Sequence, residues 1–119
     1  MLKADKLAGL EPASVFSYFE KLTTIPHGST HTKAISDYLV SFAKDHDLKY
    51  IQDESNNVII FAPGTCGMED HAPVILQGHM DMVCDQDPAI SSIDMEKDGL
   101  EVTPQRGICL CKGYDPGRR

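Results

Sequence analysis

A chain of 119 residues with 41% hydrophobic and 24% charged residues has the length and composition of one globular domain. Its formal net charge of −7 argues against nucleic acid and membrane surfaces as partners, because clustered Lys and Arg bind both. The sequence contains no run of the ~18 apolar residues that a membrane span needs, and the N-terminus MLKADKLAGLEPAS has no signal-peptide core. A cytoplasmic protein is therefore expected.

Two amphipathic helices are predicted in the first half of the chain. Apolar residues recur at helical spacing over 12–22, with Pro12 in the first turn, and again over 31–45. Between them, the Pro, Gly and hydroxyl residues of TTIPHGST predict a loop that ends on a helix-capping residue.

Strands are predicted after the second helix. The segments 48–52 and 58–61 fit an antiparallel pair, and 62–72 is a turn-rich surface loop. The β-branched run Val74-Ile75-Leu76 is typical of a central strand that is covered on both faces. This order of elements predicts an α/β layered domain, with 98–103 as one more short strand.

His79 and Asp81 follow this apolar run in the sequence GHMDMV. Gly78 would let the backbone turn, and the alternation of a strand puts His79 and Asp81 on one side. A neutral imidazole can bind zinc while a carboxylate holds its other ring nitrogen, which makes Asp81 an orienting residue. The alternative is a strand-end histidine that bonds an aspartate for structural reasons only.

Other metal candidates are weaker. His27 and His31 are four apart, but Pro26 and Gly28 put His27 in a loop, which favours surface histidines. Solvated roles are favoured for the remaining histidines and for the acidic residues after the apolar run, which are His46, His71, Asp85, Asp87, Asp94, Glu96 and Asp98. The cysteines are expected to be free thiols; these are Cys66, Cys84, Cys109 and Cys111.

Three stretches, LTTIPHGSTHTKAISDYLVSFAKDHDL, QDESNNVIIFAPGT and APVILQGHMDMVCDQD, closely resemble the N-terminal part of the bacterial non-specific dipeptidases (aminoacyl-histidine dipeptidases, peptidase D) of the M20 metallopeptidase family. The resemblance covers roughly residues 5–103. It implies the N-terminal part of a zinc-peptidase catalytic domain over 1–103, with a mixed sheet flanked by helices.

The resemblance also implies an activity: hydrolysis of unblocked dipeptides, including Xaa-His, by a water that two zinc ions activate, with manganese or cobalt as substitute metals. His79 would be a zinc ligand, Asp81 its catalytic orienting residue, and full-length members would form homodimers. The other ligands of the family fall beyond the matching part. A non-catalytic truncated fragment is therefore the alternative.

The tail 104–119, PQRGICLCKGYDPGRR, shows neither helical nor strand periodicity. Asp115 stands in G-x-D-x-G, near where the family has a metal-bridging aspartate, but Pro116 and two arginines break the pattern. One back-translation of CKGYDPGRR, read one nucleotide later, begins Ala-Lys-Gly-Thr-Thr-Leu-Gly-Gly, as the family segment does. An aberrant tail from a frameshift is the resulting hypothesis.

Overall fold

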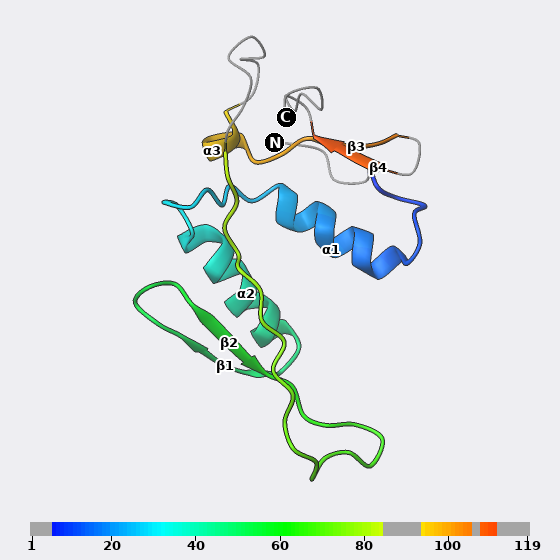
Figure 1. Ribbon diagram of the computed structural model, residues 1–119, viewed down its shortest axis with the longest axis vertical. Coiled ribbons are helices and arrows are strands. Elements are labelled where there is room, and N and C mark those ends of the chain that lie inside the picture. The colour runs from blue at the N-terminus through cyan, green and yellow to red at the C-terminus, as the bar shows by residue number, and fades with distance from the viewer. Residues whose placement is uncertain (1–5, 85–93, 106–107, 112–119) are drawn as a thin grey trace. The chain divides into compact units, whose positions relative to one another are not determined.

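The computed structural model describes residues 6–84, 94–105 and 108–111, without the side chains of 105 and 108–111. The chain divides into two compact units (Figure 1): Met1–Thr32 with Asp81–Arg119, and Lys33–Met80. Two helices, two strands, a one-turn helix and two more strands follow one another in the described part of the chain, and this mixture of helices and antiparallel strands confirms the predicted α/β class. Within the described ranges, no helix combines the length and apolar character needed to cross a membrane.

The unit Lys33–Met80 consists of a helix packed against a hairpin (Figure 1). Helix α2 spans Lys33–Asp45 and begins two residues later than expected. Strands β1 (Lys49–Gln52) and β2 (Val58–Phe61) pair antiparallel, as predicted. The turn between them is closed by Asp53, whose carboxylate accepts hydrogen bonds from the backbone N–H groups of Ser55 and Asn57 at 2.9 and 2.8 Å.

The core of this unit lies under α2. Ile35, Val40 and Ala43 are buried on one helix face. Ser36 is fully buried, and its hydroxyl donates to the Asn56 carbonyl at 2.8 Å and accepts from Gln52 Nε2 at 2.8 Å. Hydrogen bonds from Lys33 and Gln52 to the Asp37 carboxylate lower its pKa. Side-chain hydrogen bonds thus join α2 to the hairpin, in addition to the apolar contacts of the helix.

The other unit is built around helix α1, Ala13–Thr23. Pro12 is the residue before the helix and not, as predicted, part of its first turn. The Leu100 N–H donates to the Thr23 carbonyl at 2.7 Å and so attaches the C-terminal segment to the end of α1. Gly99 has φ +74°, and a Cβ there would lie 2.8 Å from the Thr23 oxygen, so the approach requires glycine.

Two elements of this unit differ from the sequence-based expectations. The one-turn helix α3 (Met95–Asp98) was not predicted; the Asp94 side chain accepts from the Glu96 N–H and caps it. Strands β3 (Val102–Gln105) and β4 (Ile108–Cys111) pair antiparallel, whereas no strand was expected after residue 103. Two residues separate them, a spacing typical of β-hairpins, and pairing overrides the weak periodicity of each strand.

The prediction of a central strand at Val74-Ile75-Leu76 is wrong. The segment is not a strand in the structure, and its three side chains are 84%, 87% and 94% exposed. An apolar run becomes a central strand only when other strands pair with it on both sides. The described strands instead form two separate two-stranded sheets, β1-β2 and β3-β4, and neither includes this segment.

We expect this exposed apolar run to make the chain self-associate, and Ile75→Lys to weaken that association by about tenfold or more, because covering an isoleucine side chain contributes about 1.5–3 kcal/mol. Analytical ultracentrifugation over a concentration series measures the change. Gln77→Lys adds the same charge two residues away, at an exposed position, without removing apolar area. An equal effect of Gln77→Lys would show that charge, and not the apolar run, controls association.

Candidate metal centre

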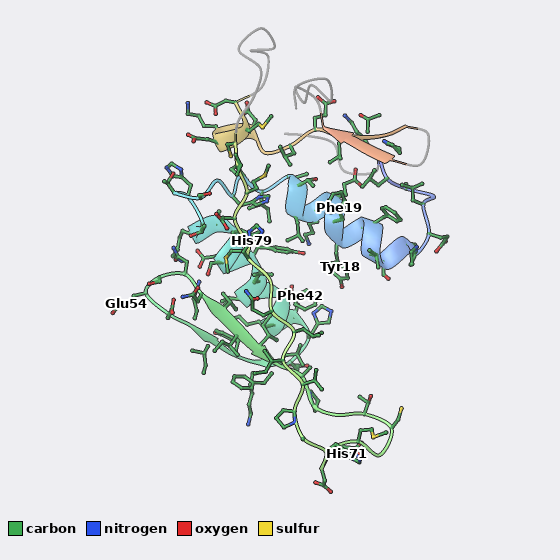
Figure 2. The ribbon with its side chains drawn as sticks, viewed as in Figure 1. Tyr18, Phe19, Phe42, Glu54, His71 and His79 are labelled. Carbon is green, nitrogen blue, oxygen red and sulfur yellow. The ribbon has the colours of Figure 1, made fainter. Side chains whose placement is uncertain are left out.

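His79 lies on an extended segment without regular secondary structure (Figure 2), and it is exposed. The expected role of Gly78 as a tight-turn glycine is not observed: positive φ occurs among the described glycines only at Gly9, Gly67 and Gly99, and a Cβ at Gly78 would meet open space. The backbone before His79 is therefore extended. His79 belongs to the unit Lys33–Met80, and Asp81 belongs to the other unit.

Asp81 is half-buried and begins a segment that is held by backbone pairing. The Met82 N–H donates to the His27 carbonyl at 3.0 Å, and Met82 forms a parallel bridge with Gly28. This bridge is a parallel pairing, whereas the two described sheets are antiparallel. It fixes the backbone that carries Asp81, a requirement for any residue that orients a ligand.

Gly28 is buried at this bridge. A Cβ on Gly28 would approach Cys84 Sγ to 3.0 Å and Glu96 Cγ to 3.9 Å. The thiol and the glutamate side chain therefore occupy the face on which Gly28 has no side chain. A side chain at position 28 would therefore have to displace the Cys84 thiol.

His27 has a more ordered setting than the expected surface position. It is half-buried, and its ring Nδ1 makes a hydrogen bond to the Ile25 carbonyl oxygen. Neither His27 nor His31 is helical, so their spacing of four does not bring them onto one helix face. His31 is exposed, with Nδ1 3.0 Å from the Thr30 hydroxyl.

The remaining candidate histidines and acidic residues that the structure describes are exposed, as predicted. His46 follows the end of α2, with Nδ1 2.8 Å from the Phe42 carbonyl oxygen, and Figure 2 labels His71 in the loop after β2. Asp94 and Asp98 belong to the cap of α3, where Lys97 Nζ lies 2.7 Å from Asp94 Oδ2. Neither Cys66, which is exposed, nor Cys84, which is half-buried, forms a disulfide within the described part of the chain. Asp85, Asp87, Asp115 and the Cys109 and Cys111 side chains lie outside the described residues.

In the described part of the chain, no three His, Cys, Asp or Glu side chains gather so that they could hold a metal ion. A protein zinc site needs three or four protein ligands. The described residues therefore do not form a complete metal site. The roles of His79 as one ligand and of Asp81 as the group that orients it stay predictions.

Known proteins resemble this chain, although no protein-family model matches it. It is 38% identical, over 79 residues, to the cytosol non-specific dipeptidase of Escherichia coli strain K12; the match covers 66% of this chain and 16% of the dipeptidase. The crystal structure of an aminoacylhistidine dipeptidase from Vibrio alginolyticus matches with a TM-score of 0.84 and 31% identity, covering 92% of this chain and 22% of that one. The chain thus spans about a fifth of the relatives' length.

Proposed function

Since this chain is homologous to one segment of the cytosol non-specific and aminoacylhistidine dipeptidases, we propose that it contributes part of the catalytic domain of a dipeptidase. The reaction is hydrolysis of unblocked dipeptides, including those that end in histidine. The observation that carries the proposal is the structural likeness, which extends over 92% of the chain at a TM-score of 0.84.

Two residues of this chain are assigned to the site. His79 supplies one imidazole ligand to a pair of zinc ions, with manganese or cobalt as alternative metals, and Asp81 orients that imidazole. Bound zinc supplies an activated water and polarises the peptide carbonyl. The backbone pairing of Met82 with His27 supports the assignment, because it holds the segment that begins with Asp81 in place.

The location, the substrates and the oligomeric state of the whole protein are proposed from its relatives. A cytoplasmic location and peptide substrates are proposed from the names of the two dipeptidases, and assembly into a homodimer from the family resemblance. The net charge of −7 supports neither nucleic acid nor an anionic membrane as a partner.

A chimera tests the proposal. The 79 matched residues of the Escherichia coli dipeptidase are replaced by those of this chain, and release of free amino acids from a Xaa-His and from another unblocked dipeptide is measured. We expect turnover of both, because the relative supplies the ligands that the described residues lack. A chimera that unfolds cooperatively and binds zinc like its parent, but hydrolyses neither dipeptide, would refute the proposed function.

The second candidate is a non-catalytic fragment, favoured by the lack of a three-ligand cluster among the described residues. On this proposal, residues 1–103 are the catalytic-domain segment and 104–119 are an aberrant tail from a frameshift. Strand β3 crosses this boundary, so the boundary marks the end of sequence resemblance and not a break between elements. The nucleotide sequence of the 3′ region tests the frameshift, and dipeptide turnover by the purified 119-residue chain would exclude the fragment.

A further inference from the structure

The β1-β2 hairpin has an apolar face that helix α2 does not cover. The register pairs Ile51 with Ile59 and Lys49 with Phe61, so these four side chains share one face of the hairpin. Helix α2 packs against both strands, and the other face of β2 is half-buried, whereas Ile51, Ile59 and Phe61 are 53%, 53% and 50% exposed. The outer face of the hairpin is thus apolar and half open to solvent.

The run Val74-Ile75-Leu76 belongs to the same compact unit and is still more exposed. Figure 1 shows it as a drawn-out trace outside both sheets, and within the described part of the chain its backbone groups make no backbone hydrogen bond. Consecutive side chains of an extended segment point to opposite faces, so both faces of the run are apolar. We call this run, together with the outer face of the hairpin, the open apolar surface.

A partner that covers the open apolar surface must supply two kinds of contact. Strands must pair with the backbone N–H and C=O groups along both edges of the run, because such groups are costly to bury without hydrogen bonds. Apolar side chains must also pack on both faces of the run and on the hairpin. The partner is therefore a layered polypeptide with unpaired strand edges, and not a single short peptide.

A second copy of this chain meets only part of this requirement. A closed two-fold contact sets one edge of the run against the same edge of its partner and leaves the other edge open. The relatives offer more: this chain matches only 22% of the aminoacylhistidine dipeptidase from Vibrio alginolyticus, at a TM-score of 0.84. Most of that dipeptidase lies outside the match, so it is long enough to supply both strands and layers.

We propose that the open apolar surface binds, as a separate polypeptide, the part of a dipeptidase chain that lies outside the structural match, called here the dipeptidase remainder. The inference rests on the proposed function, which assigns this chain to one segment of the catalytic domain, and it adds the surface to which the remainder attaches. Val74-Ile75-Leu76 becomes a strand between two strands of the remainder. Self-association of the chain alone uses the same run, so the remainder displaces the second copy.

The test co-expresses the 119-residue chain with the Vibrio alginolyticus dipeptidase from which the matched segment is deleted and to which an affinity tag is added. We expect a soluble one-to-one complex, identified by analytical ultracentrifugation. Hydrogen–deuterium exchange at the amides of 74–76 should be about tenfold or more slower in the complex than in the dilute, monomeric chain, because strand pairing protects amides.

Three results would overturn the inference. The first is a tagged remainder that stays insoluble beside the soluble chain, and the second is a purified remainder that carries no copy of it. The third is a complex in which exchange at 74–76 is as fast as in the monomer. Oligomers of this chain that persist beside an unbound remainder would make the second copy the occupant.

Charge substitutions locate the contact on the chain. Ile75→Lys and Ile59→Lys place a charge on the two parts of the open apolar surface, and each should raise the dissociation constant of the complex by about tenfold or more. Thr65→Lys is the matched control, because it adds the same charge in the exposed loop after β2 and should leave the constant unchanged. Equal weakening by all three variants would contradict binding through this surface.

Binding, and not turnover, is the readout, so this inference and the proposed function fail separately. A complex that forms with a protected run but hydrolyses no dipeptide would count against the proposed function alone. Hydrolysis by the chimera, together with separate polypeptides that do not associate, would refute this inference alone.

Discussion

Dipeptide turnover by the chimera is expected to fall by more than 100-fold when His79 is replaced by alanine. The substitution removes a proposed zinc ligand, and loss even of a group that only orients such a ligand costs 10–100-fold in metal affinity or activity, by order of magnitude. Zinc content, measured on the purified variant, should fall together with turnover. A variant that keeps both its metal and its activity would remove His79 from the site.

Asp81→Asn distinguishes the orienting role from that of a ligand. Asparagine keeps the size of the side chain but removes the charge, so we expect a loss of roughly 10–100-fold, smaller than for His79→Ala. His71→Ala is the matched control, because it removes an exposed imidazole of the same chain and should leave turnover unchanged. Equal losses in all three variants would point to a folding defect and contradict the assigned roles.

The largest expected stability effect is at Ile35. Its side chain is only 2% exposed at the contact between α2 and the hairpin, and truncation of such a residue to alanine costs about 2–5 kcal/mol, through lost burial and the cavity that remains. We expect Ile35→Ala to lower the free energy of unfolding by that amount. Urea unfolding followed by circular dichroism measures it.

Ile51→Ala is the control for this stability prediction, since the same atoms are removed from a side chain that is 53% exposed. It should cost well under half as much as Ile35→Ala, because less apolar area returns to water and no cavity forms. Ile35→Val, which removes one methylene, is expected to cost about 0.5–1.5 kcal/mol. Similar losses in the two alanine variants would mean that the hairpin face around Ile51 is also covered in solution.

The parts of the fold that could be predicted depend on neighbours in sequence. Helix α2 follows from apolar spacing along one segment, and β1 and β2 follow from alternation on either side of a short turn. One signal was available but not used: Asp94 and Gly99 flank α3 as an N-terminal cap and a positive-φ glycine. The β3-β4 hairpin could not be found from periodicity, because each strand is four residues long and depends on its partner.

For the candidate site, the sequence and its family resemblance were sufficient to select His79 and Asp81, and their roles stay predictions. His27 was dismissed because Pro26 and Gly28 indicate a loop, which is correct, since the residue is not helical. The pairing of that loop with Met82, however, joins segments far apart in the chain, and nothing in local spacing encodes it.

The sequence by itself determined the α/β class, the helix α2 and the hairpin that follows it, because periodicity and turn chemistry act over a few residues. The choice of GHMDMV as the informative motif came from the family resemblance. Only the tertiary structure decided that the apolar run before His79 is exposed and outside both described sheets, and that the loop of His27 and Gly28 pairs with Met82. Both depend on which distant backbone groups pair, since a strand exists only where a partner supplies its hydrogen bonds.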